Sequence, residues 1–190
     1  MVFVLKMLRI LDFFLATIGF AVLSPVIFFI IILGWFDTRS PLFCQERIGR
    51  GQQPFVLVKF RTMSPGTASV ASHLADVSTI TPLGSFLRRT KLDELPQLWN
   101  VLKGEMSLVG PRPNLFNQVD LINARRALSV YDVRPGITGL AQIRDIDMST
   151  PELLAKTDAE MISTMSIANY FKYIFFTVAG KGRGDRIRRQ

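Results

Sequence analysis

The feature that most constrains this chain is an uncharged apolar stretch near its N-terminus. No charged residue occurs from Phe13 to Phe36, and as a straight helix this stretch would extend about 36 Å at ~1.5 Å per residue. That length is sufficient to cross a bilayer and exceeds the apolar core of most signal peptides. No small-x-small cleavage pattern follows it. We therefore expect residues 1–38 to form a retained membrane anchor.

Ser24 and Pro25 lie in the middle of this stretch. Proline removes one backbone donor and clashes with the preceding turn, which predicts a kink or a break. Ser24 could then donate to the freed carbonyl. Basic residues flank both ends of the stretch, so both ends have the charge bias of cytoplasmic segments: Lys6, Arg9, Arg39, Arg47 and Arg50. A re-entrant helix-break-helix and a kinked single span both remain open.

Composition limits the number of domains and the kind of partner. The chain has 190 residues, of which 48% are hydrophobic, and this suits one catalytic domain plus an anchor. A net charge of +8 favours phosphates, nucleotides or acidic lipid headgroups. Cys44 is the only cysteine and His73 the only histidine. A single cysteine cannot form an intrachain disulfide, which fits a reducing cytoplasmic location. A single histidine in a stretch of small residues argues against a Ser-His-Asp hydrolase.

Residues 41–62 have the pattern of a β-hairpin, with a turn around Gly49 and Gly51. Because side chains alternate along a strand, Lys59 and Arg61 share one face of its second strand. Two such cations are typical of a solvated strand face, and they could equally bind phosphate. No dinucleotide fingerprint or P-loop occurs in the sequence, so nucleotide binding must use other residues.

An acidic pair stands at the start of the next predicted helix. Since Pro96 must lie within the first turn, the helix is expected to begin near Leu92 or Asp93 and to end at a glycine cap, Gly104. Asp93 and Glu94 then lie at the helix N-terminus. Acidic residues there are commonly caps that favour the helix dipole, so the pair by itself does not establish chemistry.

Several arginines surround this pair in sequence. Arg112 lies between two prolines, and Arg134 precedes a Pro-Gly pair. A rigid backbone lets arginine present its planar fork to a phosphate with less loss of entropy, although ordinary surface turns also contain such arginines. Arg88 and Arg89 end a short amphipathic segment that could lie near lipid phosphates.

The C-terminal part of the chain predicts two helices and a basic tail. A cap at Ser149 and Thr150, followed by Pro151, opens the first helix. The second follows Ser166 and carries a stripe that suits either core packing or a membrane interface: Ile167, Tyr170, Phe171, Ile174, Phe175 and Val178. Between residues 62 and 80 the small polar composition predicts a mobile connection, with His73 as an ordinary loop residue.

These motifs, in this order, resemble the small monotopic phosphoglycosyl transferases, which are also called the bacterial sugar transferase family. The residues that carry the resemblance span most of the chain: 24–25, 45–49, 59–63, 92–97, 101–113 and 134–142. Each block alone is weak evidence, but several specific blocks in register are strong.

The resemblance implies an α+β, mainly helical fold. A re-entrant anchor over residues 1–38, broken at Ser24 and Pro25, would hold a catalytic domain over residues 39–180 on the cytoplasmic face of the bacterial inner membrane. That domain would contain a short β-hairpin and amphipathic helices lying at the interface, and residues 181–190 would be a basic tail. Contact with membrane lipids is expected, and a homo-oligomer is allowed.

The resemblance also implies an activity. A sugar 1-phosphate would pass from a UDP-sugar to undecaprenyl phosphate with release of UMP, as the first membrane step of glycoconjugate synthesis. Asp93 would be the nucleophile of a ping-pong reaction, and Asp93 and Glu94 would hold Mg²⁺. The phosphates would meet four cations: Lys59, Arg61, Arg88 and Arg112.

Arg134 and Gln142 are expected near the nucleotide or sugar. Residues 143–147 depart from the commonest pattern of the family, so the identity of the sugar does not follow from the resemblance, and an N-acetylated deoxy-type hexosamine is only a guess. A noncatalytic protein of the membrane surface would explain the anchor and the charge but not the motifs around Asp93. Nucleic-acid binding is disfavoured, because most aromatic residues lie in apolar segments rather than among the basic residues.

Overall fold

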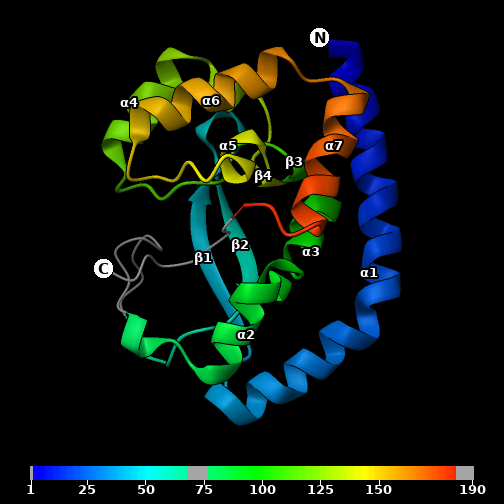
Figure 1. Cartoon of the computed structure of the whole chain (residues 1–190), viewed down its shortest axis with the longest axis vertical. Helices are drawn as coiled ribbons and strands as arrows, with labels where there is room; N and C mark the ends of the chain where they lie inside the picture. The colour runs from blue at the N-terminus through cyan, green and yellow to red at the C-terminus, as the bar shows by residue number, and fades with distance from the viewer. Residues whose placement is uncertain (1, 68–76, 183–190) are drawn as a thin grey trace.

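The computed structural model describes residues 2–67 and 77–182, so His73 and most of the predicted basic tail lie outside the described residues. The chain folds as a long N-terminal helix, a β-hairpin and a mainly helical remainder (Figure 1). The first elements are α1 (Val2–Thr38), β1 (Leu42–Ile48), β2 (Pro54–Phe60), α2 (Pro82–Thr90), the 3-10 turn η4 (Leu92–Glu94) and α3 (Gln97–Lys103). The later ones are β3 (Ser107–Val109), α4 (Val119–Ala127), the 3-10 turn η5 (Val130–Asp132), β4 (Gly136–Thr138), α5 (Leu140–Ile143), α6 (Pro151–Ser163) and α7 (Ile167–Val178).

Helix α1 is continuous through Pro25, and Figure 1 shows that it bends along its length. The Ser24 hydroxyl donates to the carbonyl of Ala21 at 2.8 Å. That carbonyl is the one that the missing amide of residue 25 would have reached, so serine replaces the lost hydrogen bond. The predicted break is therefore wrong and the predicted kink fits. Within the described residues, α1 is the one helix long and apolar enough to cross a membrane.

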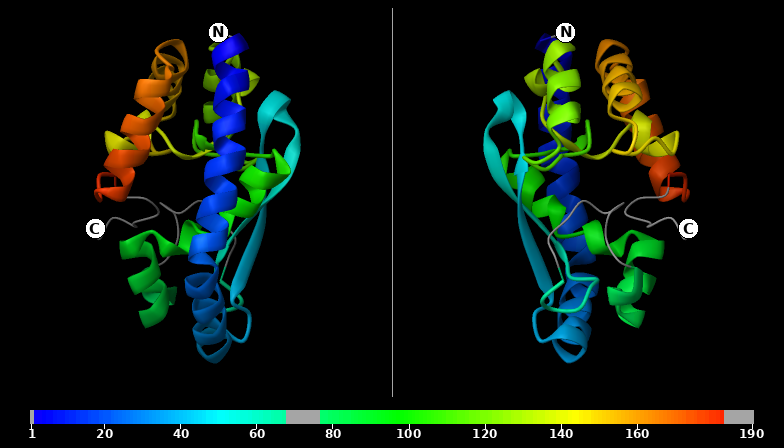
Figure 2. Two further views of the ribbon diagram at one scale, coloured as in Figure 1. Left: turned by 90° about the vertical axis from the view of Figure 1, so that its right-hand side faces the viewer. Right: turned by 90° about the vertical axis from the view of Figure 1, so that its left-hand side faces the viewer.

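One side of α1 packs against the rest of the fold, as both views of Figure 2 show. Leu8 and Ala16 are buried in two hydrophobic clusters that also contain residues of α3, α6 and α7. Asp12 is only 2% exposed. Its Oδ1 accepts hydrogen bonds from Ser107 Oγ at 3.0 Å, from the Leu108 amide at 2.8 Å and from the Tyr170 hydroxyl at 2.9 Å. The first half of α1 is thereby tied to β3 and α7.

The opposite side of α1 remains apolar and exposed. Its exposed large hydrophobic residues include Ile10, Phe13, Phe14, Ile18, Val22, Phe28, Phe29, Trp35 and Phe36. A contiguous apolar surface of this kind marks an interaction with a membrane or another protein.

The predicted hairpin is confirmed: β1 and β2 pair antiparallel, with Leu42 opposite Phe60. Leu57 and Lys59 share the inner face and are both buried, whereas Val56 on the other face is 47% exposed. A solvated position for Lys59 is therefore excluded, because the face that carries it turns toward the core.

The helix predicted to start near Leu92 begins later. Leu92–Glu94 form the separate turn η4, which follows Lys91 in the left-handed region at φ 59°. Helix α3 starts only after Pro96, its N-cap, and ends at Gly104 with φ 84°, as the glycine cap predicts. The acidic pair thus lies on a tight turn before the helix rather than in its first turn.

A close backbone approach joins the Arg112 and Arg134 loops. Strands β3 and β4 pair in parallel, and a Cβ built on Gly136 would lie 2.0 Å from the amide nitrogen of Gly110. Only glycine leaves room for this contact. The Pro-Gly pair after Arg134 therefore has a packing reason that the sequence alone does not reveal.

The stripe on α7 divides between the core and the surface. Tyr170 is fully buried, whereas Phe171, Phe175 and Val178 are 44%, 68% and 82% exposed. Core packing is therefore confirmed for Tyr170, whereas a membrane interface for the exposed residues stays a prediction. At the start of α6, Pro151 takes the first turn as predicted, but Thr150 makes no capping hydrogen bond.

The buried tyrosines predict how stability responds to alkaline pH. Burial raises the pKa of Tyr131 and, together with the nearby Asp12 carboxylate, that of Tyr170 above the ordinary value of 10.0. Both groups keep their protons in the folded state while the unfolded chain loses them. Their stabilisation is therefore complete below pH 10 and is lost as pH rises above that value and through the folded pKa.

Thermal unfolding in detergent from pH 8 to pH 11 measures this decline. The Tyr131→Phe variant is expected to lose the part of the pH dependence that belongs to Tyr131. An identical pH dependence in this variant and the wild type would contradict the assignment.

Candidate active site

The acidic pair lies in a buried polar cluster formed by three elements, β2, α2 and η4. Turn η4 packs against β2, which carries Lys59, and against α2, which carries Arg88. Asp93 and Glu94 are 2% and 7% exposed, and Lys59 and Arg88 are 8% and 7% exposed. Burial of charged groups is costly unless opposite charges and hydrogen bonds compensate. The fold therefore concentrates two carboxylates and two cations in one small region.

Glu94 is bound directly by the arginine of the two-proline loop. Arg112 Nη1 and Nη2 each lie 3.0 Å from Glu94 Oε1. The Arg112 side chain keeps 23% of its surface exposed. The loop that follows β3 thus brings a third cation to the acidic pair, and Glu94 fixes the direction of its guanidinium group.

Helix α2 is placed by an unusually close contact with the end of β2. A Cβ on Gly84 would lie 2.1 Å from the carbonyl oxygen of Thr62, so only glycine allows α2 to approach this closely. Arg88, one turn further on, donates from Nε to Thr62 Oγ1 at 2.8 Å. These contacts fix α2 and the Arg88 side chain against the segment that follows β2.

Asn100 joins α3 to the hairpin, a role that its position within a predicted helix did not suggest. It is fully buried. Its Oδ1 accepts from the Val58 amide at 3.1 Å, and its Nδ2 donates to the carbonyl of Val56 at 2.7 Å. The Val58 amide and the Val56 carbonyl of β2 are thereby hydrogen-bonded, and α3 is fixed against β2.

A buried network supports the Arg112 loop from behind. Arg125 donates from Nη1 to the carbonyl of Arg112 at 2.8 Å and to Asn114 Oδ1 at 2.9 Å. Its Nε and Nη2 lie 3.0 and 2.7 Å from Asp158 Oδ2. Arg125 and Asp158 are each 1% exposed, and burial raises the pKa of Asp158 although Arg125 opposes the shift. Neither residue stood out in the sequence, since charges on amphipathic helices are usually solvated.

Three of the predicted binding residues donate hydrogen bonds to backbone carbonyls rather than to the acidic pair. Arg61 donates from Nε to the carbonyl of Ser40 at 2.9 Å, where it holds the start of β1. Arg134 donates to the carbonyl of Gly104 at 2.8 Å. Gln142 donates to the carbonyl of Ile137 at 2.8 Å. The structure therefore groups Lys59, Arg88 and Arg112 with the carboxylates but gives these three other contacts.

The acidic pair is chemically suited to a hard divalent cation. Magnesium is usually held by one or two carboxylates together with substrate phosphates and water, not by a complete protein cage. Among the described residues, no group of three or more His, Cys, Asp or Glu side chains could hold a metal ion. Asp93 and Glu94 fit the smaller, substrate-completed type of site.

Comparison with known proteins identifies relatives of this chain. The family model described as "Bacterial sugar transferase" matches residues 4–182. A UDP-glucose:undecaprenyl-phosphate glucose-1-phosphate transferase of Caulobacter vibrioides is 37% identical over 180 residues, which cover 90% of this chain and 67% of that protein. The sugar transferase EpsL of Bacillus subtilis, described as uncharacterized, is 38% identical and covers 82% of this chain and 77% of its own length.

A third relative is a UDP-N-acetylgalactosamine-undecaprenyl-phosphate N-acetylgalactosaminephosphotransferase of Aeromonas hydrophila. It is 36% identical over 138 residues, which cover 70% of this chain and 33% of that protein. Relatives at nearly equal identity are thus named for different sugars.

Proposed function

The chain belongs to the bacterial sugar transferase family, and from this premise we propose that it transfers a sugar 1-phosphate from a UDP-sugar to undecaprenyl phosphate and releases UMP. Two relatives are named for this reaction with glucose or N-acetylgalactosamine as the sugar. The chain is a phosphoglycosyl transferase. The observation that carries the proposed mechanism is the burial of Asp93 and Glu94 against elements that carry Lys59, Arg88 and Arg112.

The reaction proceeds in two steps with Asp93 as nucleophile. A carboxylate oxygen attacks the sugar-proximal phosphorus, a new carboxyl-phosphate bond forms, and the bond to the second phosphate breaks so that UMP leaves with its electron pair. An oxygen of undecaprenyl phosphate then attacks the same phosphorus. The product is a diphosphate-linked sugar, and the Asp93 carboxylate is regenerated.

The surrounding cations reduce the electrostatic repulsion between the attacking carboxylate and the diphosphate. A carboxylate and a diphosphate repel one another, so the nonbridging oxygens need fixed positive charge. Lys59 and Arg88 are buried beside the turn that carries Asp93, and Arg112 is oriented by Glu94. When Mg²⁺ is bound by Asp93 and Glu94, it supplies further neutralisation of the phosphate charge. Glu94 is then a positioning group rather than a second nucleophile.

The membrane supplies the second substrate. We place α1 in the cytoplasmic leaflet of the bacterial inner membrane as a re-entrant anchor, with the catalytic domain on the cytoplasmic side. The exposed apolar side of α1 and the basic residues at both of its ends support this placement. A reporter fused to the N-terminus tests it, because a periplasmic signal there would require a spanning helix.

The decisive assay measures UMP release from a panel of UDP-sugars, with and without undecaprenyl phosphate and Mg²⁺. A ping-pong enzyme releases about one UMP per enzyme molecule with donor alone and continues to turn over only with acceptor present. Release that strictly requires both substrates would contradict a covalent intermediate. No release with any donor would favour a noncatalytic protein of the membrane surface.

Glu94→Gln is expected to reduce kcat about 100-fold, because the neutral amide holds the Arg112 guanidinium and a divalent cation less strongly. Its half-saturating Mg²⁺ concentration should rise, which a purely structural defect would not produce. Glu152→Gln is a matched control, since Glu152 is an exposed glutamate in the first turn of α6. An unchanged Mg²⁺ requirement in Glu94→Gln would remove Glu94 from this role.

A further inference from the structure

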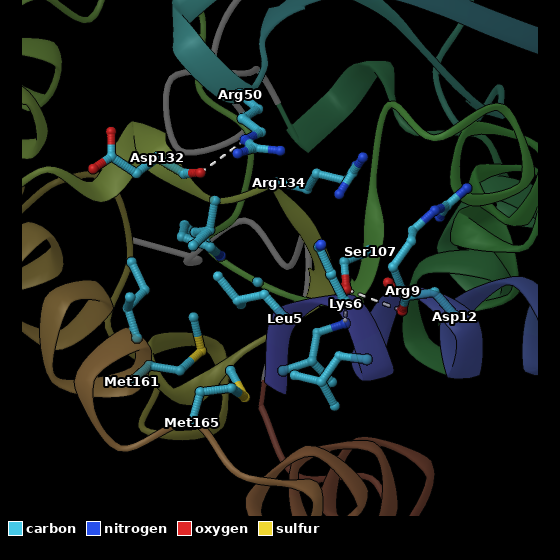
Figure 3. Close-up of a pocket in the computed structure, with 16 residues that line it drawn as sticks. Leu5, Lys6, Arg9, Asp12, Arg50, Ser107, Asp132, Arg134, Met161 and Met165 are labelled. Carbon is cyan, nitrogen blue, oxygen red and sulfur yellow. Dashed lines mark hydrogen bonds between the residues drawn. The ribbon is translucent and has the colours of Figure 1, made fainter. Parts of the chain in front are cut away.

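A cavity of about 350 Å³ lies at the N-terminal end of α1, and Asp93, Glu94, Lys59 and Arg88 are not among its lining residues. Figure 3 shows its walls, which come from α1, the Arg134 loop, the start of β3 and helix α6. Arg9 hydrogen-bonds the carbonyls of Val101 and Leu102 at the C-terminal end of α3. Turn η4 precedes the other end of this helix, so roughly 10 Å of helix at ~1.5 Å per residue separates the cavity from the acidic pair.

Four cations line this cavity: Lys6, Arg9, Arg50 and Arg134. Burial, with Arg9 and Arg50 nearby, lowers the pKa of Arg134, so these positive charges act on one another. Arg134 uses Nε for Gly104, and Arg50 uses Nε for the carbonyl of Asp132. Within residues 2–67 and 77–182, the terminal nitrogens of both arginines and the Lys6 ammonium group have no hydrogen-bond acceptor from the protein.

The two acidic residues of the lining offset only part of this charge, because four cations face two carboxylates and the Asp12 carboxylate acts on Arg9 and Arg134. Asp12 Oδ1 already accepts three hydrogen bonds, from Ser107, Leu108 and Tyr170. The Asp132 carboxylate points away from Arg50 and Arg134 in Figure 3, and only its backbone carbonyl contacts Arg50. The cavity therefore presents donors that match a phosphate group.

The rest of the lining is aliphatic or thioether in character. It includes Leu5, Leu8, Val109, Met161, Ile162 and Met165. No Phe, Tyr or Trp occurs among the described lining residues, so the cavity lacks the aromatic surface on which a nucleobase commonly stacks. Cations beside apolar side chains suit an amphiphile better than a nucleotide.

The position of Lys6 and Arg9 along α1 also favours an amphiphilic ligand. Lys6 and Arg9 stand just before the uncharged stretch that begins at Phe13, and Ile10, Phe13 and Phe14 on the outer side of the helix are exposed. Basic residues at the end of an apolar segment lie at the level of lipid phosphates.

From this geometry we propose that the cavity binds the phosphate headgroup of an anionic membrane lipid, with Lys6, Arg50 and Arg134 as donors. The inference rests on the membrane association in the proposed function. Two lipids offer this chemistry, a bulk anionic phospholipid and the undecaprenyl phosphate acceptor, and the experiment below separates them.

The test titrates the full-length protein, in uncharged detergent micelles, with dioleoylphosphatidylglycerol or dioleoylphosphatidylcholine and follows Tm. The anionic lipid should stabilise the wild type at a lower mole fraction than the zwitterionic lipid. Lys6→Gln should raise its half-saturating mole fraction about fivefold, and Lys6→Gln with Arg134→Gln more than tenfold, since each cation near a lipid surface contributes ~1 kcal/mol. Lys156→Gln, which removes an exposed charge on α6, should titrate as the wild type does.

Equal stabilisation by the two phospholipids, or wild-type titration by both cavity variants, would overturn the proposal. Stabilisation by UMP or inorganic phosphate that depends on Lys6 would also overturn it, since the ligand would then be a soluble anion. If undecaprenyl phosphate raises Tm at a lower mole fraction than phosphatidylglycerol, the lipid bound in the cavity is the acceptor substrate. If it needs a higher mole fraction, the bound lipid is a bulk phospholipid.

Lys6 has no hydrogen-bond or ion-pair partner among the described residues, so Lys6→Gln remains informative if Arg134→Gln fails to fold. The Asp93→Asn variant separates this inference from the proposed reaction. It should lose UMP release and keep the wild-type response to phosphatidylglycerol, so each proposal can fail without the other.

Discussion

Asp93→Asn is expected to abolish UMP release, with a fall in rate of at least about 1000-fold in the presence of a UDP-sugar, Mg²⁺ and undecaprenyl phosphate. The amide is nearly the same size as the carboxylate but is a far poorer nucleophile. The substitution therefore removes the attacking oxygen and leaves the packing of η4 in place. No covalent phosphosugar should form, so mass spectrometry after incubation with donor alone should show the mass shift in the wild type only.

Asp120→Asn provides the matched control, because Asp120 is an exposed aspartate near the start of α4. It should retain full activity. A Tm for Asp93→Asn close to that of the wild type would exclude misfolding as the cause of the loss. Activity in Asp93→Asn within about tenfold of the wild type would be inconsistent with the proposed nucleophile.

Arg125→Ala should lower the free energy of unfolding more than any other substitution proposed for this protein. It would leave the Asp158 carboxylate, 1% exposed, in the protein interior without its arginine. Breaking a buried ion pair in this way costs about 3–5 kcal/mol, which for a chain of this size lowers Tm by roughly 10 °C. UMP release by the folded fraction should fall as well, because Arg125 also holds the carbonyl of Arg112. Thermal unfolding and activity at a temperature below both transitions measure the two effects.

The surface pair of α5 and α6 is the control for this prediction. Arg144 and Glu160 lie 2.7 Å apart, but both side chains are 47% exposed. Water already solvates such charges, so Arg144→Ala should leave Tm close to that of the wild type. Equal losses from Arg125→Ala and Arg144→Ala would show that burial of the inner pair contributes nothing to stability.

Local features of the fold followed well from the sequence. Turn residues and alternation indicated the hairpin, and Gly104 marked the end of α3, because both features depend on a few neighbouring residues. The start of α3 was misplaced, since Lys91 adopts a left-handed conformation that ordinary residues seldom show. The break at Pro25 was wrong for a similar reason, because one hydroxyl group of Ser24 supports the continued helix.

Long-range contacts could not be predicted from one sequence. Glu94 and Arg112 were both candidates for the site, but their hydrogen bond joins residues 18 positions apart. Asp158 reaches the same loop through Arg125, 33 positions away. Nothing in local periodicity distinguishes a buried charge on an amphipathic helix from a solvated one. Motif resemblance supplied the proposed nucleophile, whereas the structure supplied the residues that pack around it.

The contacts of Asp12 have a consequence for any attempt to prepare a soluble enzyme. A truncated chain starting after Thr38 would leave the Leu108 amide, the Ser107 hydroxyl and the buried Tyr170 hydroxyl without the carboxylate that accepts from them. It would also open the hydrophobic clusters to which Leu8 and Ala16 belong. Helix α1 thus contributes to the hydrophobic core of the catalytic domain. A change in the lipid around α1 should therefore also change the order of the active site.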